Sequence, residues 1–176
     1  MSGIPPIVPV KHIDYSHMEG GLVRMMDRFK EEGTLTGDPE ADAYLRRSPG
    51  GALLGLLYDQ RMRAEGAFTG PIRLEERLGH LDFRKIAEMD LDALRSVFAE
   101  TPAVHRFTNK MAEYTKAVAQ LVTDKYGGDP ALIWNDGADF PAIEKRMREL
   151  PGFGPQKAAK MKYVLHYFGY RDFAGS

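Results

Sequence analysis

The stretch LPGFGPQK, residues 150–157, places two glycines and two prolines between two segments that have the periodicity of amphipathic helices. The upstream helix is predicted to begin at Asp139 and to end at Leu150, and Pro155 has the backbone angle that suits the first position of a new helix. Glycine adopts conformations closed to other residues, so the chain can turn sharply between the two. The stretch therefore predicts a helical hairpin over residues 140–168.

Outward from the hairpin, the chain has helical signals almost throughout. Ser16 with Glu19 has the pattern of a capping box before an apolar stripe that stops at Gly33. Asp-Pro at 38–39 and Ser-Pro at 48–49 are typical of helix starts. The segment after the second of these is apolar almost all round, which predicts a buried central helix over residues 52–57.

Further helices are predicted over residues 72–78, 83–89, 91–98, 108–126 and 130–134. No segment alternates convincingly with a period of two, so we predict no sheet. The fold class is expected to be all-α, a compact multi-helix bundle, with residues 1–47 forming an N-terminal extension whose helices pack on a core of residues 48–176.

Composition excludes several kinds of site. The 176 residues include no cysteine, which rules out disulfides, thiolate zinc sites and cysteine-ligated iron–sulfur clusters. The five histidines form no i, i+4 pair, so we expect neither a metal nor a cofactor. No apolar run approaches the roughly 20 residues of a membrane span, and the N-terminus lacks a signal-peptide pattern, so a cytoplasmic protein is expected.

Charge is distributed unevenly along the chain. Residues 144–172 contain seven basic and three acidic side chains, a net of +4, while the whole chain carries −1, which leaves −5 for the remainder. The hairpin therefore lies in the basic part of the sequence.

The predicted turn has the features of a phosphate site. Glycine amides and the free N–H groups at the start of a helix carry partial positive charge, and Lys157, Lys160 and Lys162 follow on the next helix. The alternative is a plain helical hairpin, in which the glycines serve tight packing and the lysines keep the surface soluble.

The sequence LPGFG before an alanine-containing basic helix resembles the helix-hairpin-helix motif. The stretches LTGDPEADAYL, LLYDQRM, AVHRF and LPGFGPQK together resemble a small bacterial branch of the HhH-GPD superfamily of DNA glycosylases that lacks an iron–sulfur cluster. The resemblance covers roughly residues 35–169. It implies a helical bundle with a cleft for an extruded base, a base-excision repair glycosylase, double-stranded DNA as the partner and a location on the nucleoid.

The resemblance also implies roles for particular residues. The hairpin residues would grip the DNA backbone, and the polar residue after the early helix, Gln60 with Arg61 beside it, would fill the gap left by the flipped base. A Gln60 that is buried and bonded to its own helix is the alternative. The hairpin residues concerned are Gly152, Phe153, Gly154, Gln156, Lys157 and Lys160.

Catalysis departs from the pattern of the superfamily. Gln156 stands where bifunctional members carry a lysine, and Lys157 is one residue later, about 100° around the helix, so we expect a monofunctional enzyme that uses water. The aspartate of the superfamily would fall on Ala174 or Ser176. The candidate catalytic carboxylates are therefore Asp172, if the segment after Gly169 folds back over the cleft, and Asp59, which could instead cap a helix.

The family's later helices have no counterpart, so one wall of the pocket is expected to come from residues 1–47. Arg106 and Lys110, at the start of the long helix, could reach a second phosphate or form surface ion pairs. Three aromatic side chains, Trp134, Tyr114 and Tyr126, are expected in the core rather than on a base.

Two further hypotheses remain beside the glycosylase. One is a non-catalytic helix-hairpin-helix protein that recognises distorted duplex. The other is a helical scaffold whose hairpin meets another protein.

Overall fold

In the computed structural model, which describes residues 10–175, the chain is helical and has no strand in that range, so the all-α prediction is confirmed. Nine α-helices and one short 3₁₀ helix are present among the described residues. In chain order they are α1 (Gly21–Glu32), α2 (Pro39–Arg47), α3 (Pro49–Tyr58), α4 (Ala64–Leu78), α5 (Phe83–Glu88), α6 (Leu91–Ala99), α7 (Thr108–Tyr126), η1 (Pro130–Ile133), α8 (Phe140–Arg148) and α9 (Pro155–Tyr167). No described helix has the length and apolar character that a membrane crossing requires.

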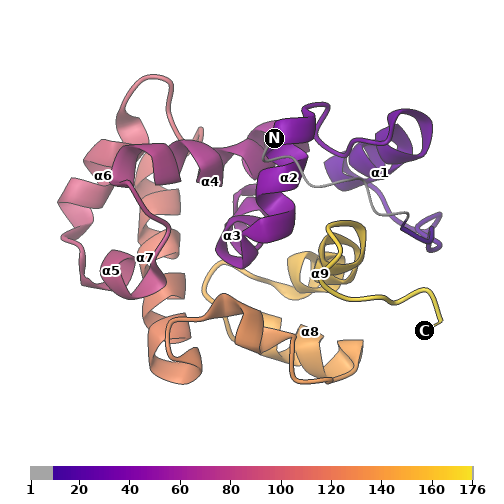
Figure 1. Ribbon diagram of the computed structural model, residues 1–176. Coiled ribbons are helices and arrows are strands. Elements are labelled where there is room, and N and C mark those ends of the chain that lie inside the picture. The colour runs from indigo at the N-terminus through magenta and orange to yellow at the C-terminus, as the bar shows by residue number, and fades with distance from the viewer. Residues whose placement is uncertain (1–9, 176) are drawn as a thin grey trace, which may run out of the picture.

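The helices gather around α3 (Figure 1). This helix packs against α2, α4 and α9, while α5 and α6 pack on the long helix α7, and α8 packs on α9. Residues 50–58 of α3 are all buried, as its apolar sequence predicted. Gly55 is necessary for this packing, because a Cβ there would lie 2.3 Å from the Phe68 ring of α4.

Local signals set most helix ends. Aspartate or serine side chains accept a backbone N–H at the starts of α2, α3 and α6, and left-handed glycines end α1, α4 and α7. The starts of α2 and α3 and the end of α1 are as predicted. These residues are Asp38, Ser48, Asp90, Gly33, Gly79 and Gly127.

Two predicted boundaries are wrong. Ser16 does not cap α1, because its amide and hydroxyl donate to Asp14, and the helix begins after Gly20 without a side-chain cap. Helix α4 begins at Ala64 rather than Ile72 and contains Pro71 in its interior. Burial of the Ala64–Pro71 part of α4 against neighbouring helices outweighs the backbone hydrogen bond that the proline removes.

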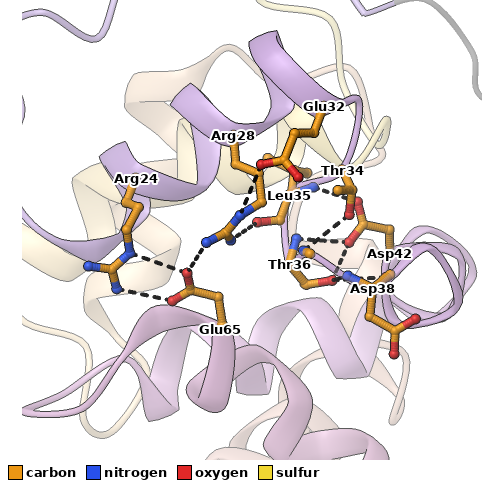
Figure 2. Close-up of polar contacts among 10 residues, drawn as sticks. Arg24, Arg28, Glu32, Thr34, Leu35, Thr36, Asp38, Asp42 and Glu65 are labelled. Atoms are coloured by element: carbon orange, nitrogen blue, oxygen red, sulfur yellow. Dashed lines mark hydrogen bonds and ion pairs between the residues drawn. The ribbon is translucent and has the colours of Figure 1, made fainter.

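Polar contacts attach the N-terminal helices to the rest (Figure 2). Glu65 of α4 pairs with Arg24 and Arg28 of α1 at 3.1 and 2.8 Å. Burial alone would raise the pKa of Glu65, but hydrogen bonds from these arginines lower it to about 2. The buried Asp42 of α2 accepts the amides of Leu35 and Thr36 at 2.7 and 2.9 Å, which fixes the loop between α1 and α2.

Candidate functional site

The predicted hairpin is formed by α8, a turn over residues 149–154, and α9. Its two glycines have different environments. Gly152 has φ +85°, and a Cβ there would lie 2.6 Å from Leu57 Cδ1 and 3.2 Å from Tyr114 Cγ. Around Gly154, no described atom lies within 4 Å of the Cβ position. Gly152 therefore packs the turn against α3 and α7, while Gly154 leaves the main chain open to solvent.

Phe153, predicted to contact DNA, is only 4% exposed and belongs to the core. Its amide donates to Leu150 O at 3.1 Å and closes the turn. Any contact of this residue with a ligand would therefore be made by its carbonyl. Trp134 is buried, and Tyr114 and Tyr126 are packed against the core, which confirms the expectation for these three aromatics.

Helix α9 begins directly after the open glycine. Gly154 is its N-cap, with Pro155 in the first helical position and Gly154 O accepting from Ala158 N at 2.9 Å. The amides of Gln156 and Lys157 lie in the first turn, where a helix supplies no carbonyl partner. This end of α9 therefore presents hydrogen-bond donors and partial positive charge.

Lys157 reaches across to α3. Its Nζ donates to Leu57 O at 2.8 Å and lies 3.4 Å from Gln60 Oε1. Burial lowers the pKa of Lys157, although the nearby Asp59 opposes that shift. Although Lys157 follows Gln156 by one residue and about 100° around the helix, both line the pocket described below.

His105 caps the same helix end. Its Nδ1 accepts from Phe107 N at 2.9 Å, so the ring proton is on Nε2, which donates to Tyr58 O at 2.7 Å. Burial lowers the pKa of His105, which favours this neutral form. A lysine and a histidine thus satisfy the last two carbonyls of α3 and fix the loop that follows, a role that sequence spacing gave no means of finding.

The loop after α3 carries three of the predicted site residues, Asp59, Gln60 and Arg61. Gln60 and Arg61 are exposed, so the alternative of a buried Gln60 is wrong. Arg61 has φ +54°, an unfavourable conformation for a residue with a side chain. Burial raises the pKa of the partly buried Asp59, and Lys160 and Lys157 oppose the shift. Asp59 is therefore a stronger base than a solvated aspartate would be.

The loop, the turn and α9 together enclose a pocket of about 550 Å³, which we call the turn pocket. It brings the open glycine, the first turn of α9 and a carboxylate to one place, from segments about 100 residues apart in the chain. Its lining residues are Asp59, Gln60, Gly152, Gly154, Pro155, Gln156, Lys157 and Lys160.

The loop before α7 and the first turn of α7 add basic side chains beside this pocket. Arg106 Nη1 donates to Arg61 O at 3.4 Å, and Lys110 Nζ lies 5.1 Å from the centre of the Tyr114 ring that packs on Gly152. Neither cation forms an ion pair with any residue in 10–175. Both therefore remain available to an anionic partner.

The structure separates Asp172 from the turn pocket. Asp172 lies beyond the C-terminal end of α9, whose 13 residues span about 20 Å. Its side chain is 72% exposed and accepts from Ala174 N, and Phe173 N donates to His166 Nδ1 at 3.0 Å. The tail thus folds against the far end of α9 and not over the pocket, which leaves Asp59 as the carboxylate at the site.

The basic segment 144–172 contributes fewer free charges than its composition suggested. Arg146 pairs with Asp136, Arg148 pairs with Glu144, and Arg171 donates to Trp134 O. The basic residues in or next to the turn pocket come instead from three parts of the chain: Arg61, Arg106, Lys110, Lys157 and Lys160.

No cluster of three or more metal-ligating side chains occurs among the residues that the structure describes. Comparison of the chain with protein-family models, with curated proteins and with solved structures found no match in any of the three.

Proposed function

We propose that the protein binds double-stranded DNA through the α8–α9 hairpin and hydrolyses the N-glycosidic bond of a damaged base turned out of the duplex. The observation that carries this proposal is the turn pocket, where a carboxylate and an exposed glutamine lie beside an open glycine turn. This function implies a protein of the cytoplasm that associates with the nucleoid.

The DNA backbone would meet the open side of the hairpin. Amides at the start of α9 can bind one phosphate, and Gly154 places no side chain between the main chain and the strand. Arg106 and Lys110 lie where a neighbouring phosphate would follow. Contacts of this kind position a protein on the duplex without reading its sequence.

The exposed loop after α3 suits insertion into the base stack. Gln60 and Arg61 project from a backbone that Arg106, Lys157 and His105 hold in place through carbonyl contacts. A fixed loop is needed because a mobile one would lose the energy gained by filling the gap. The strained conformation of Arg61 is consistent with a functional position.

Asp59 supplies the chemistry in this proposal. As the bond between sugar C1′ and the base nitrogen breaks, its carboxylate stabilises the cationic sugar and takes a proton from the attacking water. The water oxygen bonds to C1′ while the base nitrogen keeps the electron pair of the broken bond. The departing base takes up a proton from solvent, and Asp59 returns the proton it received to solvent, so that one water is divided between sugar and base. Gln156 has no nucleophilic amine, and the Lys157 ammonium is engaged by Leu57 O at 2.8 Å, so water is the nucleophile in this proposal.

A base-release assay on duplex DNA that contains alkylated, oxidised or deaminated bases tests the enzyme claim. Asp59→Asn is expected to abolish release and keep duplex affinity, whereas the matched Asp172→Asn variant releases base at the unsubstituted rate. Release that survives Asp59→Asn contradicts the role of Asp59. Tight duplex binding without any release would favour the non-catalytic DNA-binding protein, in which Asp59 is only the charge partner of Lys157 and Lys160.

Salt dependence tests DNA binding itself. Each neutralised phosphate changes the slope of log affinity against log salt by about −0.9, so three or four contacts predict a slope of about −3. Lys110→Ala is expected to remove one phosphate contact and so to reduce the magnitude of the slope by about 0.9. Lys85→Ala on α5, which packs near the far end of α7, is the control and should leave it unchanged. A flat salt dependence would favour the scaffold hypothesis.

A further inference from the structure

A second hollow adjoins the turn pocket and is not used by the chemistry proposed above. It has a volume of about 510 Å³ and lies between residues 17–19, the start of α8 and the middle of α9. We call it the α9 pocket. It is lined by His17, Met18, Glu19, Phe140, Glu144, Gln156, Ala159, Lys160, Lys162 and Tyr163.

The two hollows are neighbours along α9 and share part of their lining. Gln156 and Lys160 line both of them, and residues four apart lie on the same face of a helix in successive turns. Ala159 lines the α9 pocket with a single methyl group, so α9 can be approached closely there. A strand held at the glycine turn would therefore continue along α9 toward Tyr163.

The α9 pocket offers apolar surface and one fixed polar pair. Met18 and Phe140 line its sides, and Phe140 is held by Phe173 at 5.7 Å between ring centres. Tyr163 Oη lies 3.1 Å from His17 Nε2, and burial raises the pKa of the phenol, so it retains its proton. Such surfaces suit an unpaired base, since sites for single strands combine flat apolar groups with a basic track.

Charges of both signs face the same pocket. Lys160 and Lys162 are suited to a phosphate, while the carboxylates of Glu19 and Glu144 only accept hydrogen bonds. An exocyclic amino group, such as N4 of cytosine, donates to a carboxylate, whereas thymine presents a carbonyl oxygen at that position. Thymine would thus place its O4, a hydrogen-bond acceptor, against the carboxylate oxygens of Glu19 or Glu144, which are also acceptors.

We infer that the α9 pocket binds an unpaired deoxynucleotide of the strand that continues from the turn pocket, and that it selects a base with an exocyclic amino group. This inference rests on the proposed function, because the hairpin must first hold the strand. It defines the preferred substrate as duplex next to a single-stranded segment that carries cytosine, adenine or guanine rather than thymine, and cytosine is the test case.

Fluorescence anisotropy with five DNAs tests the inference. They are a blunt duplex, the same duplex with a short unpaired cytidine extension at the 5′ or the 3′ end of one strand, and the two matching duplexes with thymidine extensions. The cytidine extension at one polarity is expected to raise affinity about tenfold over the blunt duplex, and thymidines by clearly less. Ala159→Trp fills the α9 pocket, so it should remove the gain in affinity from the cytidine extension while leaving blunt-duplex affinity unchanged. Ala93→Trp, at an exposed alanine of α6, is the matched control and should keep the gain.

The outcomes separate the two claims. Normal blunt-duplex binding without a cytidine gain, or a gain that persists in Ala159→Trp, overturns this inference alone. Absence of blunt-duplex binding overturns the proposed function and, with it, the inference. Free deoxycytidine monophosphate that binds as tightly as the extension would assign the pocket to a free nucleotide and overturn the assignment to a strand.

Discussion

Gly152→Ala is expected to destabilise the protein strongly, although it adds only one methyl group. The residue has φ +85°, and an alanine in the left-handed region costs about 1–2 kcal/mol. The added Cβ would also lie 2.6 Å from Leu57 Cδ1, and overpacking of this kind costs about 1–3 kcal/mol. The free energy of unfolding should therefore fall by about 2–5 kcal/mol.

Gly154→Ala is the matched control, two residues away in the same turn. Its φ is −81°, and no described atom lies within 4 Å of the added carbon, so the expected change is within about 0.5 kcal/mol. Urea unfolding followed by circular dichroism measures both. With a typical slope of about 1–3 kcal/mol per molar urea, the midpoint should fall by about 1 M or more in Gly152→Ala only.

A larger side chain at Gly154 should affect duplex affinity rather than stability. Gly154→Leu places bulk where the strand would approach, so it should weaken binding while changing the unfolding midpoint little. Equal midpoints for Gly152→Ala and Gly154→Ala, or unchanged affinity in Gly154→Leu, would refute the division of roles between the two glycines.

Three other substitutions have defined outcomes. Arg61→Gly removes an unfavourable backbone conformation at φ +54°, so thermal unfolding should show equal or slightly higher stability, while anisotropy shows several-fold weaker duplex binding. Gly55→Ala places a methyl group against Phe68; overpacking exceeds the gain in helix propensity, and thermal unfolding should show a loss of about 2 kcal/mol. Glu65 has a pKa lowered from 4.5 to about 2, so its ion pairs stabilise the fold above pH 4.5 and are lost as the pH falls toward 2. Glu65→Gln should therefore lower the free energy of unfolding by on the order of 1–2 kcal/mol at pH 7 and by little near pH 2. This figure allows for solvent screening at the half-exposed Arg24, and urea unfolding at both pH values measures it.

The sequence alone predicted the features that depend on neighbouring residues. Short-range chemistry decides where a helix can start or stop, so Ser48 before Pro49 and Gly33 after the first apolar stripe marked helix ends correctly. Unbroken apolar character identified α3 as buried, and the break at residues 150–155 gave the hairpin.

Tertiary packing decided what local patterns could not. The start of α4 at Ala64 depends on burial against other helices, which overrides the signal of Pro71. The tail carries Asp172 away from the turn pocket because Phe173 and His166 hold it at the far end of α9. Contacts between residues about 100 positions apart leave no periodic signal in a single sequence.

The candidate site shows the same division. Its residue types and the glycine turn were identified from the sequence, but their assembly depends on Lys157 and His105 capping the end of α3. The sequence determined which groups carry charge and where the backbone can bend, since these are properties of single residues and near neighbours. Only the packed chain decided that Asp59 and Gln60 face Gly154, because burial and distance are set by all the helices together.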